Sequence, residues 1–366
     1  MEKTKTTMKQ KKPKILISTF FNCLRNIKSS VAAFNLGYEL ELVCKAQGWA
    51  LVQELQMSHI YNHVKIWDTP SQLEKAMRDS DADIIWCHNE PDLMAELANE
   101  PSVKRDRRVI HDCHDLPTLH PGYEDNPEMN AQEKSAIANS DIVFVPTVDY
   151  VDLIEKKYPG TGKKVEVLFS GAPEMYFPLQ DLPHVNGMLY CGQVNVPEMD
   201  SKLHYRNCVP LFQKLTQLGV ASHIYNTTPN INMMPYTMAG ACSYGTLRMY
   251  AAIDQYTRYD YGFVGSNVDT PEIQMCFPNK LMDCIAAGIP LIVLNARTAG
   301  AFVEEHDIGI SVQGVENLDT VPWIKEVNGK LENYDFWQKK KKNVLEIRHE
   351  YTMENLLKKT FDKVGI

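Results

Sequence analysis

Short runs of consecutive apolar residues recur along the chain, and segments with helical spacing separate them. Runs without polar alternation are typical of strands in parallel sheets, whose two faces are both covered by helices. The first half of the chain contains five such runs, at residues 14–18, 82–87, 108–111, 142–145 and 165–169. The pattern then starts again, with further runs at 188–191, 222–225, 261–264 and 291–294. This alternation predicts an α/β fold.

Helices are predicted between these strands from the spacing of apolar residues and from the glycines that end several of the segments. The predicted helical segments are 29–48, 129–139, 209–218 and, near the end of the chain, 334–364. Two successive sets of strands and helices predict two doubly wound, Rossmann-like domains, with ligands at the carboxyl ends of the strands. The length of 366 residues also fits two domains.

The domain boundaries are predicted from shifts in composition. We expect a basic, disordered tail at residues 1–13, an N-terminal domain at 14–175 and a C-terminal domain at 176–345. The linker contains Pro173, Pro178 and Pro183. The remaining segment, 346–366, is predicted to be a helix that could cross back to the N-terminal domain.

Composition narrows the class of protein. Hydrophobic residues make up 44 % of the chain and charged residues 23 %, as in ordinary soluble domains. The net charge of −8 makes a nucleic-acid partner unlikely on electrostatic grounds. Nine cysteines without paired spacing predict reduced thiols, and no apolar run has the roughly 20 residues of a membrane helix. We therefore expect a cytoplasmic protein.

Two basic runs qualify this expectation. Six lysines lie among the first fourteen residues, and four more are consecutive, from Lys339 to Lys342. Such runs can contact an anionic membrane at about 1 kcal/mol per basic residue, which would make the protein peripheral to a membrane. The alternative is that both runs are ordinary solvated charge.

The segment 278–294 carries the clearest candidate chemistry. A helix is predicted to start at Pro278, with Asn279 and Lys280 in its first turn, and a buried strand follows its final glycine. A helix start favours a bound phosphate, and Lys280 adds a full positive charge. Asp283 shares a helix face with Lys280 and can accept hydrogen bonds from ribose hydroxyls. The combination predicts a nucleotide site, whereas the alternative for Asp283 and Lys280 is an exposed, charged helix face.

Polar residues follow several of the predicted strands. His88 comes after the strand at 82–87, His111 ends the strand at 108–111, and His114 and Asp115 follow it. Gly192 follows the first strand of the second domain, where a glycine allows the backbone to approach a ligand. These residues are candidates for the cleft, although each could instead cap or turn a loop. The spacing of His111 and His114 lacks a third metal ligand, so no metal site is predicted.

Four segments together resemble the group 1 family of retaining glycosyltransferases with the GT-B fold. The segment 138–146 is similar to the family's strand "aD-x-vi-v-s", and 164–178 is similar to its linker "kv-x-vipnGvd…f-x-P". Residues 189–193 resemble "vyvGr", and 278–290 resemble "P-x-Kl-x-E-y-l-a-a-G-x-P". The order and register are those of the family from about residue 14 to the C-terminus. The resemblance implies two Rossmann-like domains facing a cleft.

The same resemblance implies roles for individual residues. His114 matches a histidine placed near the donor sugar, and Asp283 matches the second glutamate of a Glu-x7-Glu motif, which binds the donor ribose. Lys202 and Arg206 are the candidates for a basic residue against the phosphates. The first glutamate of the motif would fall at Met275, which departs from the family because a thioether cannot bind sugar hydroxyls as a carboxylate does.

The resemblance implies a metal-independent transferase that moves a sugar from a nucleotide-sugar co-substrate, a UDP- or GDP-sugar, with retention of configuration. No other cofactor is implied. The acceptor implied is a glycan, a lipid-linked glycan or another macromolecule, as in polysaccharide biosynthesis. Two alternatives stay open: a non-catalytic protein that binds a nucleotide sugar or glycan, and a sugar-nucleotide epimerase.

Overall fold

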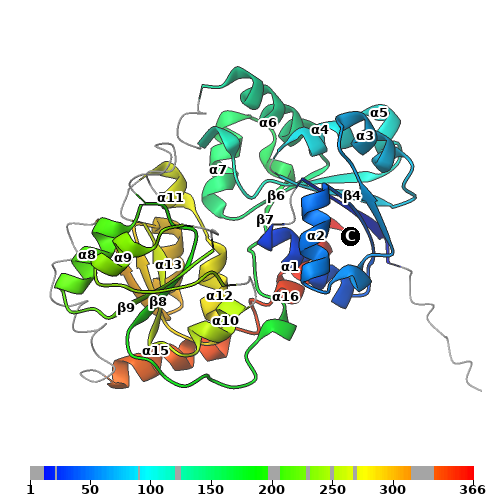
Figure 1. Cartoon of the computed structure of the whole chain (residues 1–366). Helices are drawn as coiled ribbons and strands as arrows, with labels where there is room; N and C mark the ends of the chain where they lie inside the picture. Colours follow the sequence, from blue (N-terminus) through cyan, green and yellow to red (C-terminus); the bar gives the residue numbers. More distant parts are fainter. Residues whose placement is uncertain are drawn as a thin grey trace, which may run out of the picture.

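Two parallel β-sheets organise the chain, one in each half (Figure 1). The structure is a computed structural model that describes residues 12–20, 23–89, 91–119, 125–196, 207–227, 231–247, 251–266, 270–314 and 334–366. The first sheet has the strand order β3-β2-β1-β4-β5-β6-β7, and the second has the order β10-β9-β8-β11-β12-β13. All of their pairings are parallel. The predicted α/β fold of two Rossmann-like domains is therefore confirmed.

The N-terminal sheet consists of β1 (Lys14–Thr19), β2 (Glu39–Cys44), β3 (His63–Ile66), β4 (Ile84–His88), β5 (Arg108–Asp112), β6 (Ile142–Val145) and β7 (Val165–Val167). Its helices are α1 (Leu24–Asn35), α2 (Ala46–Glu54), α3 (Pro70–Arg78), α4 (Leu93–Ala98), α5 (Pro101–Lys104), α6 (Pro127–Asn139) and α7 (Val148–Lys157). Short 3-10 helices lie at Ser58–Ile60, Pro117–Leu119, Gly162–Lys164 and, after the sheet, Glu174–Tyr176.

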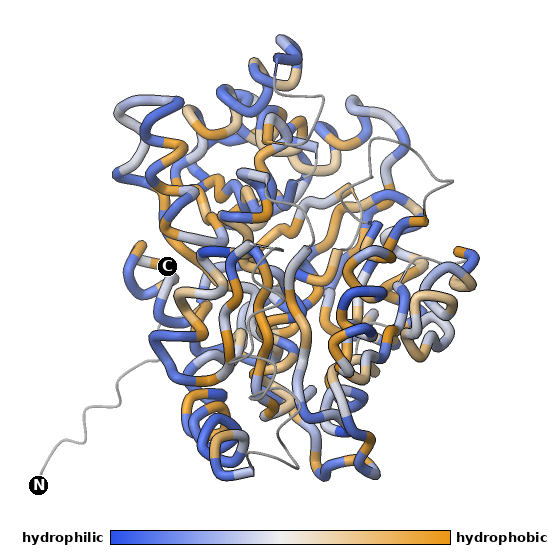
Figure 2. Tube along the Cα trace, turned by 90° about the vertical axis from the view of Figure 1, so that its left-hand side faces the viewer, coloured by the Kyte–Doolittle hydropathy of each residue, from blue (hydrophilic) through white to orange (hydrophobic). Residues whose placement is uncertain are grey.

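The C-terminal sheet consists of β8 (Met188–Gly192), β9 (Ser222–Asn226), β10 (Cys242–Tyr244), β11 (Tyr261–Gly265), β12 (Leu291–Leu294) and β13 (Gly309–Val312). The helices of this half are α8 (Val209–Gln217), α9 (Met234–Met238), α10 (Ala251–Tyr256), α11 (Pro271–Met275), α12 (Asn279–Ala287), α13 (Arg297–Glu305), α15 (Tyr334–Ile347) and α16 (Met353–Val364). In Figure 2 the apolar residues, in orange, concentrate along the strands, and polar residues occupy much of the outer helices.

One predicted helix, at 29–48, is wrong. Helix α1 ends at Asn35, Gly37 adopts a φ of 87°, and the chain then enters β2 and α2. A glycine with positive φ ends a helix because it accepts a conformation that other residues avoid. The following Glu-Leu-Glu-Leu sequence has the period of a strand, and β2 pairs with β1 on one side and β3 on the other. The pairing of β2 between β1 and β3 decided its structure.

The chain returns to the N-terminal domain at its end. Helix α15 lies under the C-terminal sheet, whereas α16 lies beside α1 (Figure 1). Met353, Leu357 and Phe361 of α16 are buried in the core of the N-terminal domain. The guanidinium of Arg108 donates to the carbonyl oxygens of Val364 and Gly365, at 3.1 and 2.9 Å. The last helix therefore ties the two halves together.

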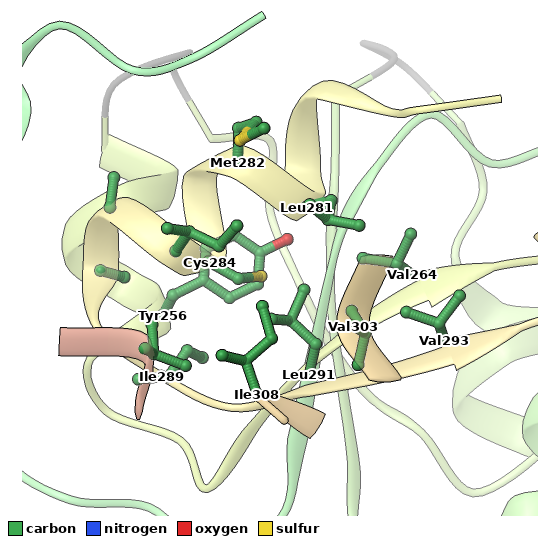
Figure 3. Close-up of a cluster of buried hydrophobic side chains, with 14 of the residues drawn as sticks. Tyr256, Val264, Leu281, Met282, Cys284, Ile289, Leu291, Val293, Val303 and Ile308 are labelled. Carbon is green, nitrogen blue, oxygen red and sulfur yellow. The ribbon is translucent and has the colours of Figure 1, made fainter. Parts of the chain in front are cut away.

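Helix α12 is held firmly against the C-terminal sheet. Its residues Leu281 and Cys284 face β11 and β12 within a cluster of buried apolar side chains (Figure 3). Gly262 of β11 allows this contact, because a Cβ there would lie 2.1 Å from the sulfur of Cys284. Gly288 ends the helix in the left-handed conformation, with a φ of 74°. The start of α12 is thereby fixed at the carboxyl edge of the sheet.

Candidate functional site

A cleft of about 460 Å³ lies between the two domains. The loops that line it follow the strands β1, β5, β6, β7, β8, β9 and β11, so the carboxyl ends of both sheets face it. Ligands of doubly wound domains bind at this edge. Of the residues predicted for the site, the cleft is lined by His114, Asp115, Gly192, Asn279, Lys280 and Asp283.

The start of α12 forms one wall of the cleft. Pro278 is its N-cap residue and provides no side-chain hydrogen bond to the first turn. The hydroxyl of Ser170 donates to the side-chain oxygen of Asn279 and so connects the interdomain linker to the helix start. A helix start directs backbone N–H groups along the helix axis, and this end of α12, together with the helix dipole, favours an anion in the cleft.

The ammonium group of Lys280 lies 3.9 Å from the centre of the Tyr190 ring, where it makes a cation–π contact. Gly192 provides the space beside it, because a Cβ at this position would lie 2.9 Å from Nζ of Lys280. Gly192 therefore admits a side chain of the protein itself, in addition to any role in ligand approach. The contact with Tyr190 places the Lys280 ammonium group between β8 and the first turn of α12.

Asp283 makes a contact that sequence did not predict. Its Oδ1 accepts a hydrogen bond from Nζ of Lys28, on α1 of the other domain, at 2.6 Å. Both side chains are almost completely buried, with exposed fractions of 8 % for Asp283 and 1 % for Lys28. The pair is an ionic contact between the domains. The second carboxylate oxygen, Oδ2, is the atom of Asp283 that a ribose hydroxyl could approach without displacing Lys28.

Arg25 lies one turn before Lys28 on α1 and also lines the cleft. Its Nε donates to Oδ1 of Asp112 at 2.7 Å, and both side chains are buried. The positive charge of Arg25 contributes to holding the pKa of Asp112 below its usual range, although burial alone would raise that pKa. Asp112 is therefore an ionised carboxylate beneath the cleft.

His88 and His111 do not line the cleft. Both side chains are fully buried, with Nδ1 of His88 3.5 Å from Oδ2 of Asp112 and Nε2 of His111 3.4 Å from Oδ1 of Asp92. Burial lowers the pKa of His88 to about 3 and that of His111 to about 4, which keeps both rings neutral at ordinary pH. These two residues support the floor of the site.

His114 is the histidine that reaches the cleft. Its Nε2 lies 3.9 Å from the Cys23 sulfur and 3.8 Å from Oδ2 of Asp115. Burial disfavours the protonated ring, but Cys23 and the two neighbouring aspartates outweigh burial and raise the pKa of His114 to about 9. His114 is therefore a hydrogen-bond donor at neutral pH, suited to bind an oxygen of a sugar or phosphate.

The ligand atoms of His88, Asp112 and His114 lie within 4.8 Å of one another, a spacing that a metal ion could bridge. The surroundings do not fit a cation, because the guanidinium of Arg25 already neutralises Asp112 at 2.7 Å. Adding a divalent ion would place several positive charges together in a buried region. Within the described parts of the chain, this is the group of side chains that comes nearest to a metal site.

Met275 is not among the residues that line the cleft. It packs against the core of the N-terminal domain, and its carbonyl oxygen accepts a hydrogen bond from the Thr147 hydroxyl at 3.3 Å. Glu272, on the same short helix, does line the cleft. Sequence reasoning missed Glu272 because it looked for a carboxylate eight residues before Asp283.

Arg25 and Lys28 were missed because the first helix was predicted to start too late, at residue 29. The signal was present: two cations three residues apart lie in the segment that follows the first strand. Cys23, one of the nine cysteines predicted to be reduced thiols, is the N-cap residue of α1.

Two predicted phosphate-binding residues, Lys202 and Arg206, lie outside the described residues. The basic run at 339–342 lies on α15 and has acidic partners: Lys339 and Lys340 pair with Asp307, and Lys341 pairs with Asp181. This run offers less positive charge to an anionic surface than the sequence alone suggests. None of the described helices has the length and apolar character needed to cross a membrane.

Comparisons with protein-family models and with curated protein sequences gave no match. Solved structures do match over almost the whole chain. Alr3699/HepE of Anabaena, in complex with UDP-glucose, has a TM-score of 0.70 and 14 % identity, over 96 % of this chain and 100 % of that one. A glycosyltransferase of Rickettsia africae has a TM-score of 0.70 and 12 % identity, over 96 % and 97 %.

An alpha-glucosyltransferase in complex with UDP-glucose and DNA is also similar, with a TM-score of 0.68 and 11 % identity over 97 % of this chain and 99 % of that chain. At identities this low the similarity establishes the fold. The protein therefore has the two-domain GT-B fold that it shares with glycosyltransferases, one of them solved with UDP-glucose.

Proposed function

We propose that the protein is a glycosyltransferase that moves a sugar from a UDP-sugar to an acceptor hydroxyl, with retention of configuration. The observation that carries this proposal is the convergence of the α12 start, Lys280 and Asp283 on one interdomain cleft. Anion binding and ribose binding are thereby combined at the site where doubly wound domains hold nucleotides. The similar structures solved with UDP or UDP-glucose support the choice of base.

The donor diphosphate would lie at the start of α12, next to Lys280. Departure of the nucleotide diphosphate places negative charge on the β-phosphate, and the fixed positive groups stabilise that charge in the transition state. His114 would donate a hydrogen bond to the donor from the opposite wall. Lys202 and Arg206 remain candidates for further phosphate contacts.

Retention is supported by the resemblance of 278–290 to the retaining family. In a front-face reaction the leaving phosphate oxygen takes the proton of the acceptor hydroxyl as the new glycosidic bond forms on the same face. Glu272 provides a carboxylate on the cleft in place of the one missing at Met275, and we assign it to hydroxyl groups of the donor sugar.

A glycan or a lipid-linked glycan is the proposed acceptor. One similar structure contains DNA, but the net charge of −8 opposes a polyanionic acceptor here. We expect the uncharged or weakly charged hydroxyl acceptor to enter from the N-terminal side of the cleft, because three of the proposed donor groups, Lys280, Asp283 and Glu272, lie on the C-terminal side.

A non-catalytic nucleotide-sugar-binding protein is the second candidate. The position of Met275, packed into the N-terminal domain and away from the cleft, favours it. Such a protein would bind a UDP-sugar but would release no nucleotide. An epimerase has no comparable support among the described cleft residues.

Calorimetric titration with UDP-, GDP- and ADP-sugars, followed by assays of nucleotide release, tests the proposal. We expect selective binding of a UDP-sugar, slow release of UDP, and a loss of affinity of roughly tenfold or more in Asp283→Asn, since hydrogen bonds to charged groups contribute about 1.5–3 kcal/mol. Asp254→Asn is the matched control, because Asp254 is exposed on α10 of the same domain.

The outcomes separate the candidates. Binding without nucleotide release, even with acceptor extracts, would favour the non-catalytic protein. Absence of binding to every nucleotide sugar would contradict the proposal itself. NMR of the anomeric proton in a transfer product decides between retention and inversion.

A further inference from the structure

Cys23 is the feature of the cleft that glycosyl transfer does not use. It is the N-cap residue of α1, it lines the cleft, and its sulfur lies 3.9 Å from Nε2 of His114. A thiol beside a cationic imidazole and at a helix N-terminus has the environment of reactive cysteines. Of the groups that face it, His114 favours the thiolate and Asp112 opposes it.

The other cysteines provide a contrast. Burial raises the pKa of seven of the remaining thiols: Cys44, Cys87, Cys113, Cys191, Cys208, Cys276 and Cys284. Burial acts on Cys23 too, but the charge and hydrogen bond of His114 outweigh it and lower the pKa of this thiol. Cys242 is the exposed cysteine, on the short strand β10.

A second observation points to an anion next to Cys23. Arg25 also lines the cleft and is only 2 % exposed, yet one of its two terminal nitrogens, Nη2, has no hydrogen-bond partner in the described structure. A buried guanidinium nitrogen without an acceptor is costly, and an anionic group in the cleft would satisfy it. The N-terminal end of α1 adds positive potential at the same place.

We propose that Cys23 is a modification site that forms mixed disulfides with anionic low-molecular-weight disulfides, and that the adduct blocks the cleft. The Cys23 thiolate attacks one sulfur of the disulfide, the new sulfur–sulfur bond forms as the old one breaks, and the second half leaves as a thiolate that takes a proton from solvent. The carboxylate of the attached half would face Arg25. This step needs no oxidant other than the disulfide itself.

Two small disulfides of similar size and opposite charge test the site: dithiodiglycolate, which is anionic, and cystamine, which is cationic. The native protein is treated at neutral pH, and adducts are quantified by peptide mass spectrometry at Cys23 and at exposed Cys242. We expect Cys23 to react about tenfold faster than Cys242 with dithiodiglycolate, because His114 favours the Cys23 thiolate and Arg25 attracts the anionic reagent. With cystamine, the ratio of the Cys23 rate to the Cys242 rate should be smaller.

His114→Gln removes the imidazole and should reduce the Cys23 rate to near that of Cys242. The assignment would be overturned by faster labelling of Cys242, by an unchanged Cys23 rate in His114→Gln, or by a Cys23 preference for cystamine. Each of these rates is measured from the mass of the adduct, so none of them depends on donor binding.

The blocking effect is measured separately, with UDP-glucose as the probe. It rests on the proposed function, so binding by the reduced protein is measured first. We expect dithiodiglycolate to abolish that binding, dithiothreitol to restore it, and the binding of Cys23→Ser to be unaffected by the reagent. Unchanged UDP-glucose binding by protein that is fully modified at Cys23 would contradict the proposed blocking effect. A reduced protein that binds no UDP-glucose would count against the proposed function, while the labelling rates still decide the modification site.

Discussion

Three histidines near the carboxyl edge of one sheet have different properties because their burial and neighbours differ. His88 and His111 are buried and have lowered pKa values, whereas His114 lies beside Cys23 and Asp115 and has a raised pKa. The sequence predicted all three as candidates from their positions after strands. Their separation into two supporting residues and one cleft residue depended on the packing around each ring, which strand position alone does not specify.

The lowered pKa of His111 predicts a pH dependence of stability. The unfolded ring titrates near 6.5 and the folded ring near 4, so the unfolded state takes up the proton first as pH falls. The stabilising contribution is complete above pH 6.5 and is lost between about 6.5 and 4. His111→Gln should therefore lessen the drop in unfolding free energy between pH 7 and pH 5 by about 2 kcal/mol.

Urea unfolding at the two pH values measures this difference. His59→Gln is the matched control, because His59 is exposed on a short 3-10 helix of the same domain. If His111→Gln and wild type lose the same stability on acidification, the buried ring is not the group that titrates.

At the scale of elements, α12 does most to define the proposed donor site. Its sequence showed a helix start, a first-turn lysine and a terminating glycine, and all of these features are local. What the sequence did not show is how closely the helix approaches β11. That approach depends on Gly262, which faces Cys284 across the interface.

Gly262→Ala should destabilise the C-terminal domain, because the added methyl group would lie 2.1 Å from the Cys284 sulfur. Overpacking of this kind costs about 1–3 kcal/mol. Thermal unfolding measures the loss. The double variant with Cys284→Ala removes the clashing sulfur and should recover part of the stability. Equal stability of Gly262→Ala and wild type would show that the interface can relax.

Gly192→Ala tests the neighbouring element, the end of β8. The new methyl group would displace the Lys280 ammonium, which is the end of a flexible side chain, so we expect an intact fold with UDP-glucose affinity about tenfold lower. Gly245→Ala is the control, since nothing lies within 4 Å of a Cβ there. Retained affinity in Gly192→Ala would argue against Lys280 as a phosphate contact.

At the scale of the whole molecule, two of the contacts that join the domains lie near the cleft and behind it. The buried pair of Lys28 and Asp283 crosses the cleft, and α16 inserts Phe361 into the N-terminal core. The pair places a residue proposed for ribose binding in direct contact with the opposite domain. Under the proposed function, donor binding uses the same carboxylate that joins the two domains.

Lys28→Met should leave Asp283 buried without its cation. Removing one partner of a buried pair typically costs about 3–5 kcal/mol. Chemical denaturation should show this loss, and adding Asp283→Asn should restore part of it. Lys342→Met, at an exposed i,i+4 pair with Glu346, should change stability by less than about 0.5 kcal/mol. If Lys28→Met changes stability as little as Lys342→Met does, the buried pair of Lys28 and Asp283 contributes little to the stability of the protein.

The sequence by itself determined the architecture and one wall of the site. Apolar runs, glycines and prolines act over a few residues, so most of the strands (though not β2, β3, β10 and β13) and α12, with Asn279, Lys280 and Asp283, could be predicted from local patterns. Only the tertiary structure decided the other wall. Cys23 and Arg25 line the cleft opposite α12, and Lys28 reaches Asp283, through the packing of one domain on the other. Lys28 and Asp283 are far apart in the sequence and meet only in the folded protein. A local sequence pattern spans a few residues, so it cannot predict such a pair.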